Sequence, residues 1–120
     1  EITLPIGFPH YRGESTGIAS PLYAKTLVFK QGDTHGAIVV CDLISITRGL
    51  SRIVREKACK QTDIPFENIS ITATHTHTGP SYGKQMHEYS DREASGKLTE
   101  EDKSGYLSTL IERIIITPKF

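Results

Sequence analysis

Two histidines separated by a single threonine, His75 and His77, are the residues whose type and spacing best support chemistry. They follow residues 68–72, a short β-branched run that is typical of a strand. Successive side chains alternate faces along an extended backbone, so we expect both imidazoles to point the same way. Zinc accepts such nitrogen ligands at the mouth of a strand. The pair therefore predicts a metal site or, as the simpler alternative, two half-exposed side chains at a strand end.

A carboxylate stands in a comparable place upstream. Asp42 directly follows the apolar run of residues 37–41. In α/β folds, ligand-binding and active-site residues lie at the carboxyl ends of the strands. If the two strands are neighbours, Asp42, His75 and His77 converge on one edge of a sheet. The alternative is that Asp42 closes a turn or caps the chain locally.

The segments around these residues have the pattern of paired strands. Residues 23–29 read as one strand, and residues 31–33 as the turn after it. Residues 37–41 read as a second strand, whose unbroken apolarity predicts burial on both faces. The first half of the chain is therefore expected to supply a β-hairpin.

A helix should connect the second strand to the histidines. Apolar residues recur at helical spacing from Ile46 to Ala58. The helix should end near Gln61, because residues 63–65 (Asp-Ile-Pro) cannot continue it. The next strand leads to His75. The fold class predicted is α/β, a mixed β-sheet with a βαβ centre, flanking helices and one domain over residues 1–120.

The last third of the sequence gives weaker signals. Residues 81–98 are polar, contain glycines and lack periodicity, which predicts a long loop over the histidine pair. Thr99 followed by three acidic residues is typical of a helix start. Apolar positions between Leu107 and Ile115 should form the buried stripe of that helix, which Pro118 should end.

Composition excludes several classes of function. The chain has 14 Lys plus Arg and 14 Asp plus Glu, so no overall charge favours nucleic acid. Its apolar runs are too short for a transmembrane segment. Cys41 and Cys59 lack metal-site spacing, and we expect two free thiols, the first buried and the second at least partly buried.

Four blocks in order resemble the amino-terminal part of the neutral (neutral/alkaline non-lysosomal) ceramidase family. They are residues 2–7 (ITLPIG), 21–28 (PLYAKTLV), 38–43 (IVVCDL) and 68–80 (NISITATHTHTGP). The resemblance covers about residues 1–80 and is most specific in the last block. It implies a larger zinc-amidase-like domain, of which this chain is a part. It also implies a secreted, periplasmic or cell-surface protein.

The resemblance implies a zinc-dependent amidase that cleaves N-acyl sphingosine or a related lipid amide. By similarity, His75 matches the first zinc ligand, His77 a catalytic histidine beside the metal, and Asp42 a supporting acidic position. The family's later ligands (a histidine, a glutamate and a tyrosine) and its serine nucleophile have no counterpart in residues 81–120. His87 is the best further candidate ligand.

Three interpretations follow. The first is a hydrolase whose site is completed by the remainder of a longer chain or by another copy in a homo-oligomer. The second is a non-catalytic structural or binding protein that keeps the ceramidase-like scaffold. The third is another His-x-His metallohydrolase, which the Thr-Gly-Pro after His77 does not favour. Under the first interpretation, this chain by itself should bind zinc weakly and show little amidase activity.

Overall fold

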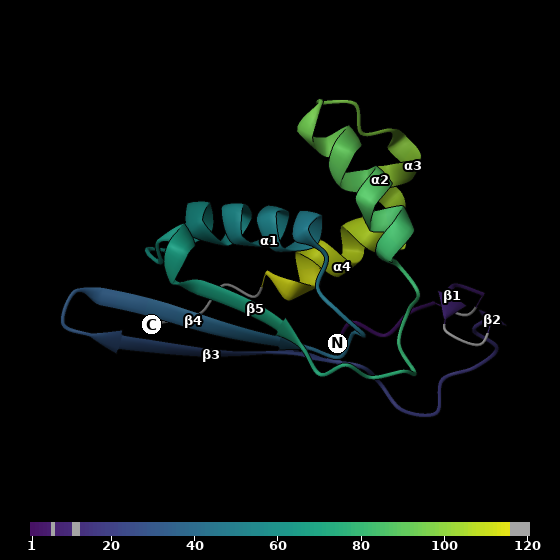
Figure 1. Cartoon of the computed structure of the whole chain (residues 1–120), viewed down its shortest axis with the longest axis horizontal. Coiled ribbons are helices and arrows are strands. Elements are labelled where there is room, and N and C mark those ends of the chain that lie inside the picture. The colour runs from purple at the N-terminus through teal and green to yellow at the C-terminus, as the bar shows by residue number, and fades with distance from the viewer. Residues whose placement is uncertain (6, 11–12, 116–120) are drawn as a thin grey trace.

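The computed structural model describes residues 1–5, 7–10 and 13–115 (Figure 1). Its centre is a three-stranded mixed sheet of order β3-β4-β5. Strands β3 (Ala24–Gln31) and β4 (Thr34–Cys41) form an antiparallel hairpin, and β5 (Ile69–Ala73) pairs with β4 in parallel. The helix α1 (Arg48–Gln61) connects β4 to β5. The predicted mixed α/β fold with a βαβ centre is therefore confirmed.

The helix α1 ends where the sequence predicted, and a capping residue marks its start. The Thr47 hydroxyl accepts a hydrogen bond of 3.1 Å from the backbone amide of Leu50, which caps the first turn. The helix buries Leu50, Ile53 and Val54 and stops at Gln61, ahead of the Asp-Ile-Pro segment. A 3-10 turn, η1 (Phe66–Asn68), then leads into β5.

The two faces of the sheet differ in what covers them. Helices α1 and α4 (Tyr106–Ile114) lie on the same side of the strands (Figure 1). On the other face Leu27 is 64% exposed, Phe29 52% and Ile38 38%. Burial of residues 37–41 on both faces was therefore a wrong expectation, because the described helices cover only one face. The alternation along β4 is that of a half-buried strand.

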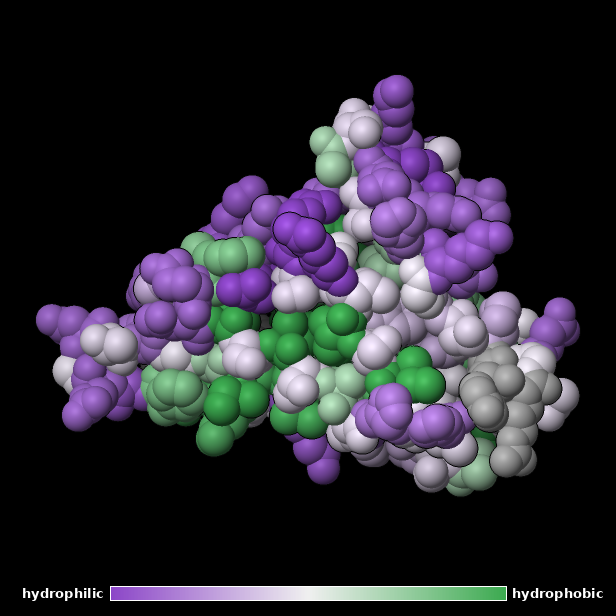
Figure 2. Space-filling view, viewed as in Figure 1, coloured by the Kyte–Doolittle hydropathy of each residue, from purple (hydrophilic) through white to green (hydrophobic). Residues whose placement is uncertain are grey.

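Polar residues gather on the helical side of the molecule. Figure 2 shows hydrophilic residues over the outer side of α1 and over the upper helices, with apolar residues along the strands below. Among the described residues, no helix combines the length and apolarity that crossing a membrane requires.

The prediction of a loop over residues 81–98 was wrong, because most of this segment is the helix α2 (Gly83–Ala94). Its buried stripe is narrow, consisting of Met86, Tyr89 and Ser90, and the remaining polar side chains give the segment a loop-like composition. The helix packs closely on α1. A Cβ atom at Gly49 would clash with the Ser90 hydroxyl oxygen, so only glycine fits there without a shift.

The predicted helix start at Thr99 is confirmed by a capping box with Asp102. One long helix was expected, but Gly105 separates α3 (Glu100–Ser104) from α4. The stripe of α4 is buried as expected, through Leu110, Ile111 and Ile114. The helix ends at Ile114, and Pro118 lies outside the described residues.

The amino-terminal segment completes the core. Ile2 is fully buried, and its amide donates to the carbonyl oxygen of Leu22 at 2.8 Å. The Tyr106 hydroxyl of α4 donates to the Ile2 carbonyl oxygen at 2.6 Å. Two short strands, β1 (Pro9–His10) and β2 (Gly13–Glu14), follow as a separate antiparallel pair.

Both thiols are free, as predicted, with Cys41 buried and Cys59 partly buried. Burial, followed by the nearby charge of Asp42, raises the pKa of Cys41 to about 12. Cys41 is therefore a neutral packing group at physiological pH.

Candidate functional site

The histidine loop, residues 74–81, begins where β5 ends at Ala73. The backbone amide of His75 donates to the Leu43 carbonyl oxygen at 3.0 Å, which ties this loop to the connection between β4 and α1. To make this turn, His75 adopts a φ of 66° in the left-handed region. That conformation costs an L-residue about 1–2 kcal/mol. The expected extended alternation through the histidine pair is therefore wrong at His75.

The His75 ring is held by a backbone carbonyl. Its Nδ1 atom lies 2.7 Å from the carbonyl oxygen of Ile44. A carbonyl oxygen only accepts hydrogen bonds, so Nδ1 is the donor, and in a neutral imidazole Nε2 then has the lone pair that a metal needs. Metal-binding histidines have this arrangement, with the second ring nitrogen donating to a carbonyl or carboxylate.

The two rings of the pair lie against each other. Their centroids are 5.0 Å apart and their planes are nearly perpendicular, at 87°. Two imidazoles that bind one tetrahedral zinc at about 2 Å have ring centres roughly 5 Å apart. The separation of His75 and His77 therefore suits a shared metal ion, and both side chains are exposed.

Asp42 lies at the same edge of the sheet, but its carboxylate serves local structure. One oxygen accepts from the backbone amide of Tyr23 at 2.9 Å, and the other accepts from the Thr74 hydroxyl at 3.2 Å. Within the described ranges, no group of three or more His, Cys, Asp or Glu residues could hold a metal ion. The structure thus brings His75 and His77 together, but Asp42 does not join them in such a group.

His87 has a different place from the one expected. It lies on α2 and is exposed, and its Nε2 atom is 3.6 Å from the Asp91 carboxylate one turn later. Its partner is therefore on its own helix.

Tyr82 supports the site and was missed by the sequence analysis. Its side chain is buried, and its hydroxyl donates to the Ser45 carbonyl oxygen at 2.6 Å. The Tyr82 hydroxyl oxygen in turn accepts a hydrogen bond of 3.4 Å from the backbone amide of Thr47. Burial raises the pKa of Tyr82 to about 12, so it stays a neutral donor. An isolated aromatic residue in a polar stretch gave no signal of this role.

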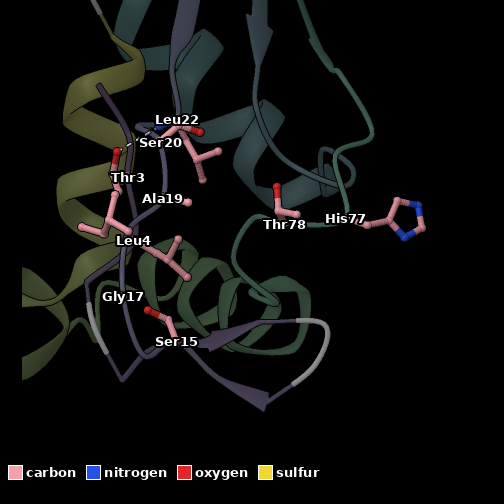
Figure 3. A pocket seen from close by; sticks show the side chains of 10 residues that line it. Thr3, Leu4, Ser15, Gly17, Ala19, Ser20, Leu22, His77 and Thr78 are labelled. Carbon is pink, nitrogen blue, oxygen red and sulfur yellow. Dashed lines mark hydrogen bonds between the residues drawn. The ribbon is translucent and has the colours of Figure 1, made fainter.

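A cavity adjoins the histidine loop and is called the N-terminal hollow here. It has a volume of about 530 Å³. Figure 3 shows it from close by, with the side chains that line it. Its lining combines apolar and hydroxyl side chains: Thr3, Leu4, Ser15, Gly17, Ile18, Ala19, Ser20, Leu22, His77 and Thr78. The ring of His77 is directed away from this space (Figure 3).

Comparisons of the chain with protein-family models, curated proteins and solved structures give no match. The resemblance to neutral ceramidases therefore stays a prediction that rests on the four sequence blocks.

Proposed function

We propose that this chain contributes part of the active site of a zinc-dependent amide hydrolase of the neutral ceramidase type. The substrate would be N-acyl sphingosine or a related N-acyl lipid. The observation that carries the proposal is the 2.7 Å hydrogen bond between His75 Nδ1 and the Ile44 carbonyl oxygen. It leaves Nε2 as the ligand atom and fixes the ring at the carboxyl edge of the sheet.

In this proposal His75 holds the metal through Nε2. A zinc ion bound there would supply polarisation of the amide carbonyl and activation of water. His77, with its ring centre 5.0 Å from that of His75, orients or protonates the reacting groups. Asp42 is a positioning residue. Its carboxylate accepts a hydrogen bond of 3.2 Å from the hydroxyl of Thr74, the residue before His75.

A catalytic zinc needs three protein ligands, and the described pair supplies at most two. The proposal therefore draws the remaining ligands from further chain or from a second copy. Bound by the pair alone, zinc should dissociate readily, and the chain by itself should show little amidase activity.

The second candidate is a non-catalytic binding or structural protein on the same scaffold. The arrangement of Asp42 favours it, since both of its carboxylate oxygens already accept hydrogen bonds from Tyr23 and Thr74. Under this interpretation His75 and His77 keep their places for structural reasons alone.

Zinc binding to this chain separates the two candidates. We would titrate zinc by calorimetry into the wild type, His75→Asn and His87→Ala. Asparagine tolerates the left-handed backbone at position 75, and His87 is an exposed histidine away from the pair. We expect weak binding by the wild type, the same binding by His87→Ala and none by His75→Asn. Equal binding by the wild type and His75→Asn rejects the ligand assignment, and no binding by any of the three favours the non-catalytic protein.

A further inference from the structure

The N-terminal hollow has an apolar floor. Leu4 and Leu22 are largely buried, and Figure 3 shows both side chains reaching into the space beside Thr78. Ile18 lines the same hollow and is 55% exposed, which leaves it accessible to a ligand. No Asp, Glu, Lys or Arg belongs to the lining formed by the described residues.

Three of the four hydroxyl groups in the lining, those of Thr3, Ser15 and Thr78, already have partners in the protein. Thr3 donates to the Glu1 carboxylate at 2.7 Å and accepts from the Leu22 amide at 2.9 Å. Ser15 donates to the Pro5 carbonyl oxygen at 3.3 Å. The Thr78 hydroxyl shares a hydrogen bond of 2.9 Å with that of Thr76. A ligand would therefore gain mainly apolar contact at Leu4, Ile18 and Leu22, because three of the lining hydroxyl groups are occupied.

We infer that the N-terminal hollow binds a single aliphatic chain. Its volume of about 530 Å³ lies within the range of small-ligand pockets, roughly 300–1,000 Å³. Each methylene that is buried should tighten binding by roughly fourfold. The absence of charged lining residues in the described part of the chain argues against an anionic or cationic head group inside it.

The position of the hollow gives this inference a consequence for the substrate. His77 and Thr78 form one wall, so a bound chain would lie against the histidine loop. Resting on the proposed function, this makes the substrate an N-acyl amide with one hydrocarbon chain ordered by these residues. Any second chain would lie elsewhere.

Binding of fatty acids to the metal-free chain tests the inference. Octanoate and laurate would be titrated by calorimetry in the presence of EDTA, below their critical micelle concentrations. We expect laurate to bind at least about tenfold more tightly than octanoate, because it buries additional methylenes. Equal affinities for the two acids would overturn the inference.

Two substitutions on the same loop locate the site. Ala19→Phe fills the hollow, whereas the matched control Thr16→Phe adds the same ring at an exposed position outside the lining. We expect Ala19→Phe to weaken laurate binding at least tenfold and Thr16→Phe to leave it unchanged. Laurate-induced amide shifts in NMR spectra should cluster at residues 15–22 and 77–78. Unchanged binding by Ala19→Phe, or shifts at the exposed sheet face around Leu27 and Ile38 instead, would overturn the inference.

The two proposals fail separately. Laurate binding that Ala19→Phe weakens, together with zinc binding that His75→Asn leaves intact, keeps the aliphatic site and rejects the His75 ligand. The opposite pattern keeps the metal assignment and rejects the aliphatic site.

Discussion

The hydroxyl group of Tyr82 lies 2.6 Å from the carbonyl oxygen of Ser45, to which it donates a hydrogen bond. The preceding carbonyl along the chain, that of Ile44, is the one that fixes the His75 ring. A buried residue therefore bonds the backbone next to the carbonyl that contacts the His75 ring. Three further hydrogen bonds hold the connection between β4 and α1. The Thr47 hydroxyl accepts from the Leu50 amide of α1, and the Thr47 amide donates to the Tyr82 hydroxyl at the start of α2. The His75 amide of the histidine loop donates to the Leu43 carbonyl oxygen.

Removing the Tyr82 hydroxyl should destabilise the connection between β4 and α1. Tyr82→Phe leaves the Ser45 carbonyl and the Thr47 amide without a buried partner, which should lower the free energy of unfolding by about 1–3 kcal/mol. Urea unfolding measures this loss. Tyr23→Phe removes a hydroxyl from an exposed ring and should change stability little. Equal stability of the Tyr82→Phe and Tyr23→Phe proteins would contradict this role for Tyr82.

The left-handed backbone at position 75 predicts an unusual order of stabilities. Asparagine and glycine tolerate a φ of 66° better than alanine does. His75→Asn should therefore be more stable than His75→Ala, by on the order of 1 kcal/mol. Thermal unfolding of the two variants gives the comparison. An alanine variant at least as stable as the asparagine variant would show that position 75 is not strained.

Acid should weaken the contact between α2 and α3. Hydrogen bonds from Arg92, and next from the backbone amide of Thr99, hold the pKa of Asp102 well below its usual value. A depressed carboxyl pKa gives stability that is complete above the unfolded value of about 3.9 and is lost as the pH falls below it. Asp102→Asn should therefore flatten the acid side of the stability profile, measured by urea unfolding from neutral pH downward. Asp33→Asn, in the exposed hairpin turn, should keep the wild-type slope.

The two thiols should differ in reactivity. The raised pKa and burial of Cys41 should keep it unmodified by iodoacetamide in the native protein at neutral pH, while Cys59 reacts slowly. Both should react in urea. Mass spectrometry of the labelled peptides gives the extent at each residue, and full-rate labelling of native Cys41 would contradict its burial.

The uncovered sheet face should promote self-association. Leu27 and Ile38 lie opposite each other on β3 and β4, on the exposed side. Ile38→Lys should reduce any concentration-dependent association seen by sedimentation velocity. Gln85→Lys adds the same charge to exposed α2 and should not. Association that persists unchanged in Ile38→Lys would place the contact elsewhere.

The central part of the fold was predictable from the sequence because its periodicity is strong. The helical spacing from Ile46 to Ala58 and the short apolar or β-branched runs on either side specify the βαβ unit locally. The helix α2 was not predictable in this way, because only Met86, Tyr89 and Ser90 face the core and the other positions are polar. Its stability comes from packing on α1, which a linear pattern does not record.

The candidate site was predictable only in its residue types. The sequence placed His75 and His77 at the end of a strand, and the structure brings their rings together. The left-handed turn at His75 and the contact with Ile44 depend on the neighbouring connection, so periodicity could not indicate them. The N-terminal hollow likewise joins segments far apart in the sequence, such as Leu4 and Thr78.

The hydrogen bond from Tyr106 to the Ile2 carbonyl oxygen joins residues that are 104 positions apart. During synthesis on the ribosome, Ile2 and Leu4 emerge early, but this partner is added only when α4 is made. Contacts of such long sequence separation form late and slow the folding of a domain. The nascent chain should therefore expose its amino-terminal apolar residues to chaperones until α4 has left the exit tunnel.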